Sequence, residues 1–337
     1  MATVICYIYP MKQLIILVPD GHHNLSSVIG SYKIFTRAND HFKSQDRKPV
    51  FTIRLAGLSK QVDLYEGLFS VKPHVSIKEV KRCDLVIIPS LNHQYGRVTT
   101  ENREMATWIR QQYDKGAEVA SICTGAFLLA STGLLDGKSC STHWSAAEAF
   151  RNQFPQVRLL EGRLITDENG VYTNGGAYSF LNLIIYLIEK YYDRATAIYC
   201  AKVFQIDVSR DSQSPFMIFS RQKVHSDDVV REAQVLMENN PSEHYSIKAL
   251  AEKYAVSRRN FDRRFIHATG NTPLEYLQRI RIEASKKAFE NSRKTVNEVM
   301  YEVGYQDAKA FRDVFRKVTG LSPLDYRRRY HKDRDAV

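Results

Sequence analysis

The 337-residue sequence has little of what marks secreted or membrane proteins. Its longest strongly apolar run, "FLNLIIYLI" from Phe180 to Ile188, is about half the length that a bilayer requires. The start, "MATVICYIYPMKQ", has no charged leader and no small-residue cleavage site. We therefore expect a cytoplasmic protein without a membrane segment.

Paired cysteines are also missing from the sequence. The cysteines are odd in number and never spaced as Cys-x-x-Cys, so the sequence favours reduced thiols over a disulfide framework or a zinc knuckle. The five are Cys6, Cys83, Cys123, Cys140 and Cys200. The adjacent His22 and His23 have no recognisable third ligand, so we expect solvated side chains and no metal site.

Charge is not concentrated in one half of the chain. The formal net charge of +11 favours an anionic partner such as nucleic acid. The excess is shared almost equally between residues 1–225 and residues 226–337. Bulk charge therefore does not locate the binding surface, and the positions of individual charged residues must do so.

Short apolar runs alternate with helical stretches over the first two hundred residues. The strand-like runs are "QLIILVPDG", "VFTIRLAG", "CDLVIIPS" and "AEVASIC", and "RLITDENGVYTNGG" has the pattern of a hairpin. Helical patterns are expected at residues 22–43, 101–116, 124–135, 177–192 and 195–204. This alternation predicts an α/β domain with a mainly parallel sheet covered on both faces.

The pattern lapses between residues 207 and 226, where polar residues surround an isolated apolar cluster. We place a linker there. After it, every segment has helical spacing punctuated by Pro and Gly. The predicted organisation is an α/β domain at residues 1–206, the linker at 207–226 and an all-α domain at 227–337.

A helical unit is duplicated in the last hundred residues. The stretch "VSRRNFDRRFIHATGNTPLEY" is matched about fifty residues later by "VGYQDAKAFRDVFRKVTGLSPLDYRRRY". Each copy predicts a helix-turn-helix, at 246–267 and 295–318, with Phe at positions i and i+4 of the second helix. The matched pairs are Ile247 and Val296, Leu250 and Val299, Tyr254 and Val303, Val256 and Tyr305, Phe261 and Phe311, Phe265 and Phe315, Gly270 and Gly320, Pro273 and Pro323, and Tyr276 and Tyr326.

If the phenylalanines face inward, polar and charged residues of each second helix face outward. Arg and Lys contact phosphates or guanine, Asn pairs with adenine, and Asp accepts from cytosine. The predicted DNA-contacting residues are Arg258, Arg259, Asn260, Asp262 and Arg263 in the first copy and Lys309, Arg312, Asp313 and Arg316 in the second. A helix at about 273–292 could hold the copies roughly 34 Å apart, one turn of DNA. A single basic amphipathic helix is usually only a solvated surface, but the duplication favours DNA binding.

The helical domain resembles the DNA-binding domain of AraC/XylS-family transcription regulators. The resemblance covers about residues 228–330 and includes the pattern "GYxxxxxFxxxFxxxxGxSPxxYR" in the second copy. Asp313 departs from the family, which usually has a basic or polar residue there. The resemblance implies double-stranded DNA as the partner, with RNA polymerase as a further candidate.

Cys123 follows a predicted strand and precedes a predicted helix in "ASICTGAFLLASTGLLDG". The positive end of that helix would lower the pKa of the thiol. His143, in "CSTHW", is a candidate base or hydrogen-bond partner for the sulfur. The common alternative is that both residues only fill the core.

Residues 13–204 resemble the DJ-1/PfpI, or class I glutamine amidotransferase-like, domain, in the version fused to AraC-type domains in regulators similar to the GlxA group. The matching elements are "SICTGAFLLA", "GLLDG" and "THW". The resemblance implies a flavodoxin-like sandwich with a mainly parallel sheet. Enzymes of the superfamily usually have a carboxylate after the first strand, and the position matched here is Ser27. Their frequent Cys-His neighbours are replaced by Cys123 and Thr124.

These departures predict that the α/β domain is not an enzyme and needs no cofactor, because a general acid-base role near the sulfur lacks its donor. We expect a domain that senses an unknown small-molecule effector around Cys123, Thr124 and His143, or that forms a homodimer. The alternatives are a cysteine-dependent amidase or hydratase-like enzyme using Cys123, and a redox sensor in which oxidation of Cys123 alters DNA affinity.

Overall fold

The computed structural model describes residues 11–92, 94–219, 222–223 and 225–331, so Cys6 lies outside the described residues. The chain divides into two compact units, Met1–Gln213 and Ser214–Val337, which we call the α/β unit and the helical unit. The boundary falls inside the stretch predicted as a linker.

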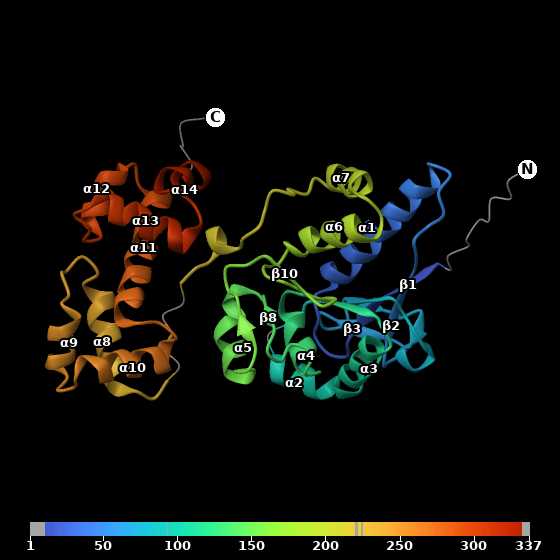
Figure 1. The fold of residues 1–337 in the computed structure, drawn as a ribbon, viewed down its shortest axis with the longest axis horizontal. Helices are drawn as coiled ribbons and strands as arrows, with labels where there is room; N and C mark the ends of the chain where they lie inside the picture. Colours follow the sequence, from blue (N-terminus) through green and yellow to red (C-terminus); the bar gives the residue numbers. More distant parts are fainter. Residues whose placement is uncertain (1–10, 93, 220–221, 224, 332–337) are drawn as a thin grey trace, which may run out of the picture. The chain divides into compact units, whose positions relative to one another are not determined.

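A seven-stranded sheet forms the centre of the α/β unit, in the order β10-β11-β7-β6-β1-β2-β5 (Figure 1). Neighbouring strands are parallel except for the hairpin of β10 and β11. The mainly parallel sheet and the hairpin are therefore confirmed. The strands are β1 Lys12–Val18, β2 Phe51–Gly57, β5 Val75–Ser76, β6 Leu85–Ile88, β7 Glu118–Ile122, β10 Ile165–Glu168 and β11 Val171–Asn174.

Helices cover both faces of this sheet, because its central strands are apolar on both sides. One face packs against α1 Leu25–Lys43, α6 Phe180–Tyr191 and α7 Arg194–Val203. The other packs against α2 Tyr95–Glu101, α3 Arg103–Asp114, α4 Ala126–Ala130 and α5 Ala147–Gln153. Two small ribbons are also present, β3 Val62–Leu64 with β4 Phe69–Val71 and β8 Ser139–Cys140 with β9 Arg158–Leu159.

The helix predicted at 101–116 is wrong at its start. The chain breaks at buried Asn102, whose side chain exchanges two hydrogen bonds with the backbone of Asp20. These two long-range hydrogen bonds hold Asn102 between the end of α2 and the start of α3. Gly116, with φ of +95°, closes the segment as predicted. The helix predicted at 124–135 is also shorter, because α4 ends at Ala130 and turns follow.

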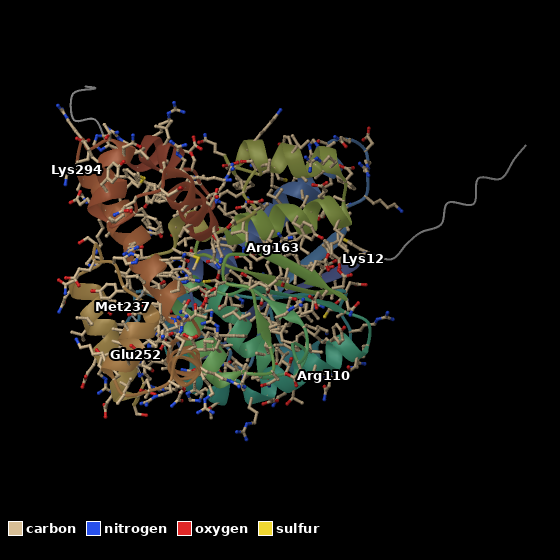
Figure 2. All side chains as sticks on the ribbon, turned by 60° about the vertical axis from the view of Figure 1, so that its left-hand side comes forward. Lys12, Arg110, Arg163, Met237, Glu252 and Lys294 are labelled. Carbon is tan, nitrogen blue, oxygen red and sulfur yellow. The ribbon has the colours of Figure 1, made fainter. Side chains whose placement is uncertain are left out.

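The helical unit contains two separate apolar cores joined by one long helix. The first core is formed by α8, α9 and α10 with the start of α11, and it includes fully buried Met237 (Figure 2). The second is formed by the end of α11 with α12, α13 and α14. The helices are α8 Asp228–Asn239, α9 Ile247–Lys253, α10 Arg258–Thr269, α11 Pro273–Asn291, α12 Val296–Glu302, α13 Ala308–Thr319 and α14 Pro323–Tyr330.

None of the helices formed by the described residues has both the length and the apolarity needed to cross a membrane.

Candidate nucleic-acid interface

The first helix-turn-helix module consists of α9, a tight turn and α10. Ser246 and Ser257 cap the two helices by accepting hydrogen bonds from backbone N–H groups in their first turns. Ala255 in the turn has φ of +54°, a left-handed conformation that is unusual for a residue with a Cβ. Phe261 and Phe265 are fully buried, so α10 has its predicted inward face.

The second module, α12 and α13, repeats this construction. Thr295 and Asp307 are the caps, and Phe311 and Phe315 are fully buried. Its turn contains Gly304, with φ of +85°. The two modules therefore share helix phase, capping and core, as the duplication predicted.

A contact between the modules fixes how they are placed within the helical unit. Arg281 of α11 donates to the backbone oxygens of Pro241 and Glu243, at 2.8 and 2.7 Å, in the loop after α8. The guanidinium also lies 5.4 Å from the ring centroid of Tyr305 in the second module. A Cβ on Gly304 would lie 2.4 Å from the carbonyl oxygen of Ser242. Glycine is thus required where the loop meets the second turn.

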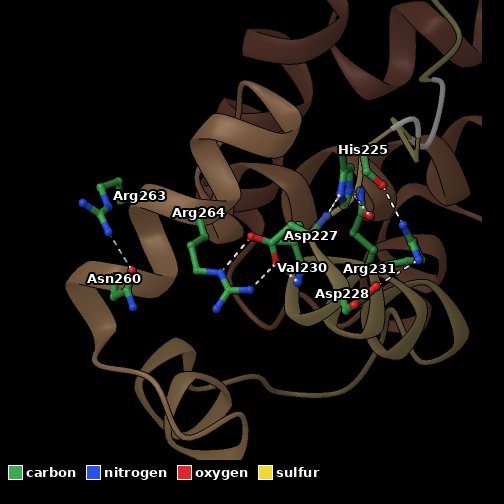
Figure 3. A network of polar contacts seen from close by, with 9 residues as sticks. His225, Asp227, Asp228, Val230, Arg231, Asn260, Arg263 and Arg264 are labelled. Atoms are coloured by element: carbon green, nitrogen blue, oxygen red, sulfur yellow. Dashed lines mark hydrogen bonds and ion pairs between the residues drawn. The ribbon is translucent and has the colours of Figure 1, made fainter.

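The charged side chains of α10 are largely engaged with each other. Arg258 forms an ion pair with Asp262 at 2.9 Å, and Arg263 donates to the side-chain oxygen of Asn260 at 3.2 Å. Figure 3 shows Arg263 contacting Asn260, while Arg264 reaches Asp227. Of these residues, all but Arg264 and Asp227 were predicted to contact DNA.

Arg264 has a structural role instead. Its guanidinium donates two hydrogen bonds to Asp227, at 2.6 and 2.8 Å, and Asp227 is the N-cap of α8 (Figure 3). The guanidinium of Arg264 is the main reason that the pKa of the Asp227 carboxyl lies below its usual value. This pair ties α10 to α8.

The charged side chains of α13 are exposed and without partners. Among the described residues, none forms a hydrogen bond or ion pair with Lys309, Arg312, Asp313 or Arg316 through their side chains. The same holds for Arg259 in α10. The nine predicted residues all lie outside the two cores, five on α10 and four on α13. Whether they touch DNA remains a prediction.

Three exposed residues further along these helices, Ile266, His267 and Lys317, were not predicted from the sequence. Ile266 in α10 and Arg316 in α13 occupy matching places, as do His267 and Lys317. Of these, only Arg316 was named. Helix phase could have found the others, since Ile266 lies seven residues, or two turns, after Arg259.

Cys123 lies, as predicted, where β7 passes into a short helical turn. It has φ of +54° and is 4% exposed. The expected lowering of its pKa is wrong: burial raises the pKa of the thiol, and this outweighs the opposing effect of nearby donors from Ser90, Thr124 and His143. The thiol is therefore protonated at neutral pH.

His143 and Thr124 both adjoin Cys123. The backbone N–H of His143 faces the sulfur. The ring accepts from the N–H of Ser145 at 3.2 Å through Nδ1. Thr124 donates through its hydroxyl to the carbonyl of Leu91 and contacts the hydroxyl of Ser90 at 2.9 Å.

Ser27 occupies the region where a carboxylate was sought. Its hydroxyl donates to the carbonyl of Asn24 at 2.7 Å and accepts from the N–H of Ser90 at 3.2 Å. The expectation that both histidines of the preceding loop are solvated is wrong for His23, which is fully buried. Burial lowers the pKa of His23 to about 4, so its ring is neutral at pH 7.

The α/β unit also contains four buried cysteines and a cavity. Cys83, Cys123, Cys140 and Cys200 are free and buried. The described residues contain no group of three or more His, Cys, Asp or Glu placed to hold a metal. A cavity of about 540 Å³ lies near α3 and is lined in part by Lys78, Lys81 and Trp108.

The fold and the paired modules define a two-unit class of protein, with a flavodoxin-like α/β unit and an AraC-type helix-turn-helix unit. The family model described as "DJ-1/PfpI family" matches residues 15–190, and the one described as "Helix-turn-helix domain" matches residues 250–329. The chain belongs to the DJ-1/PfpI family. Both resemblances drawn from the sequence are confirmed.

Related proteins have the same arrangement. The HTH-type transcriptional regulator GbdR of Pseudomonas aeruginosa is 26% identical over 277 residues, which cover 82% of this chain and 74% of GbdR. The HTH-type transcriptional regulator GlxA of Rhizobium meliloti is 24% identical over 224 residues, covering 66% of this chain and 69% of GlxA. A crystal structure from Vibrio parahaemolyticus, assigned as a transcriptional regulator, has a TM-score of 0.52 at 22% identity. It covers 58% of this chain and 99% of its own, and supports the fold alone.

Proposed function

We propose that this chain is a sequence-specific transcription regulator that binds double-stranded DNA through its helical unit. The observation that carries the proposal is the pair of helix-turn-helix modules, whose exposed helix faces are lined with Arg and Lys. The contacts of Arg281 and Gly304 with the loop after α8 keep the modules in one arrangement. Recognition of two successive major grooves requires such a fixed arrangement. Regulators such as GbdR and GlxA have this architecture.

The second helix of each module, α10 in the first and α13 in the second, contributes differently to this binding. Arg259 and Arg263 of α10 donate to base edges, Asn260 orients Arg263, and Arg258 and Asp262 lie beside them as an ion pair. In α13, Lys309, Arg312 and Arg316 bind phosphates or guanine, and Asp313 accepts from cytosine. The free state of the α13 cations supports this, because they need not give up a protein partner to meet DNA.

Selection of bound fragments from random duplex DNA tests the proposal directly. We expect a recovered motif with two half-sites about one helical turn apart, and an affinity that falls steeply with salt. Equal affinity for all duplexes at every salt concentration would reject sequence-specific regulation.

We propose further that the α/β unit does not catalyse a reaction. Two observations support this: Ser27 stands where the carboxylate was sought, and burial raises the pKa of the Cys123 thiol. Cys123→Ala should leave DNA binding unchanged. Turnover of an amide or a reactive carbonyl compound that disappears in Cys123→Ala would favour the enzyme instead.

The role left for the α/β unit is regulation, by a small-molecule effector bound around Cys123, Thr124 and His143 or by homodimer formation. RNA polymerase is a candidate partner of the DNA-bound protein, and the cytoplasm is the proposed location. Ultracentrifugation and screening of small metabolites by thermal shift would separate a dimerising unit from a sensing one.

The chain between the units is suited to carry such a signal. Gln213, the last residue of the α/β unit, is 1% exposed. Its side-chain amide donates to the carbonyls of Thr142 and Glu161, at 2.9 and 2.6 Å, and its oxygen accepts from the N–H of Trp144. Thr142 in turn donates to the carbonyl of Cys123 at 2.9 Å. Gln213 is therefore fixed to the segment beside the candidate effector site.

The next residues belong to the helical unit and are fixed just as firmly. We call residues 214–219 the strap. Buried Lys286 of α11 donates to the carbonyl of Met217 at 2.5 Å and to Glu283 at 2.8 Å, and Glu283 accepts from the N–H of Phe219. The ring of Phe219 packs on Tyr276, which belongs to the core of the first module. Gln213 and Met217, four positions apart in the chain, are thus each bonded within their own unit.

We propose that the connection from Gln213 to the strap couples the candidate effector site to the modules. Coupling is reciprocal, so DNA binding should slow amide hydrogen exchange at residues 142–144 by about fivefold or more. Six Gly and Ser residues inserted between Gln213 and Ser214 should abolish that effect while DNA affinity is retained. Equal exchange with and without DNA in the unaltered chain would reject the coupling but leave DNA binding standing.

A further inference from the structure

The outward face of α10 carries one apolar residue. Ile266 is 48% exposed, and it stands where α13 has Arg316. It lies two helical turns after Arg259 and three residues after Arg263, so all three side chains share one stripe opposite the buried phenylalanines. Ile266 is not needed to fill the core of the first module, which is complete without it.

The surroundings of Ile266 indicate what would cover it. Arg259 and Arg263 make the stripe attractive to a polyanion, while the exposed side chain of Ile266 can make no hydrogen bond to a base edge or a phosphate. In the major groove of DNA, the apolar group that a base pair presents is the C5-methyl of thymine. The chemistry of the stripe therefore fits a duplex in which a thymine lies beneath Ile266.

We infer that Ile266 is a specificity-determining residue that recognises the methyl group of one thymine in the half-site bound by α10. The inference rests on the proposed function. It assigns different roles to matching places in the two modules, since Ile266 selects a base through apolar contact and Arg316 provides charge.

Replacement of thymine by deoxyuridine tests this inference, because it removes only the methyl group and keeps the base pair. With the operator recovered by selection, the full-length protein should lose about fourfold in affinity at one substituted position, the worth of one buried methyl group. Ile266→Ala should bind the normal operator about fourfold more weakly and show no further loss with deoxyuridine at that position. A melting curve for Ile266→Ala checks that the fold is kept.

Arg316→Ala provides the matched control, since it should weaken binding while leaving the deoxyuridine effect intact. Indifference of the unaltered protein to deoxyuridine throughout the half-site, or an effect that persists in Ile266→Ala, would overturn the inference. If Ile266→Ala changed transcription but not DNA affinity, a protein partner would be indicated and the inference would also fall. Absence of any selective operator would instead count against the proposed function itself.

Discussion

The two helix-turn-helix modules have nearly the same scaffold but different charged surfaces. In both, the second helix buries two phenylalanines, ends at a left-handed glycine and is followed by a Tyr that packs on the second Phe. On α10 the cations are mostly paired, as Arg258 is with Asp262, whereas on α13 they have no partner among the described residues. Packing therefore fixes the duplicated core, whereas the outward residues are free to differ between the modules.

The shared core gives the largest expected effect. Phe265→Ala and Phe315→Ala should each lower the free energy of unfolding by roughly 3–5 kcal/mol, because each ring is fully buried between aromatic neighbours. Denaturant unfolding measures both, with Leu324→Ala as the control, since Leu324 is 47% exposed. Markedly unequal costs would break the claim that the scaffolds are equivalent.

The turns should distinguish the modules next. Gly304→Ala should cost about 2–4 kcal/mol, because a Cβ would collide with the Ser242 backbone and φ is positive. The reverse change in the first module, Ala255→Gly, should be close to neutral, since it removes a side chain from a left-handed position. Thermal unfolding of both variants checks this, and a tolerant Gly304→Ala would contradict the contact between the modules.

Base recognition by α10 can be tested at Arg263. Arg263→Ala should lose about 1–3 kcal/mol of binding free energy and relax preference at one base pair. A competition binding assay against operators altered at single positions measures the change. Unchanged affinity and selectivity would remove Arg263 from the interface, and with it the distinct role given to α10.

The Asp227–Arg264 pair belongs to the first module alone, because Val314 takes the place of Arg264 in the second. Asp227→Ala should cost about 0.5–2 kcal/mol at pH 7 through loss of the cap on α8. The pKa of Asp227 is lowered in the folded protein, so its contribution is present at neutral pH and is lost as pH falls below about 4.

Unfolding measured at pH 7 and pH 3 should therefore show the cost of Asp227→Ala shrinking in acid. Asp228→Ala, which alters the exposed neighbouring carboxylate, is the control. A cost that stays constant with pH would show that the charge of Asp227 does not matter.

The smallest effects should come from single cations of the outward faces. Arg316→Ala should weaken binding to all duplexes alike and reduce the slope of log affinity against log salt by about 1. Arg258→Ala should change that slope less, since its guanidinium is already bonded to Asp262. Salt titrations of the two variants compare them, and equal slopes would erase the contrast between α10 and α13.

The sequence predicted most of what periodicity controls. The apolar runs gave the central strands, and the spacing of Phe261, Phe265, Phe311 and Phe315 gave the faces of α10 and α13. Prediction from the sequence failed where residues distant in the chain determine a helix boundary or a pKa. Asn102 breaks a helix by bonding Asp20, and burial of Cys123 outweighs the hydrogen-bond donors near its sulfur. Neither effect leaves a local pattern in the chain.

The same limit applies to the candidate sites. Outward positions on α10 and α13 follow from helix phase alone, so the nine predicted residues were found outside the cores. Helix phase did not predict which of these residues form ion pairs or hydrogen bonds with other side chains. The contacts of Arg281 with the loop at Pro241 and of Lys286 with Met217 join residues 40 and 69 positions apart, and only the folded chain brings them together.

The strap has a practical consequence for anyone who divides this protein into pieces. A fragment that begins at residue 227, after the polar stretch, would remove Phe219 from Tyr276 and would leave the ammonium of Lys286 without the carbonyl of Met217. A fragment that begins at Ser214 keeps both contacts. Fusions that exchange one α/β unit for another should accordingly be spliced at the bond between Gln213 and Ser214.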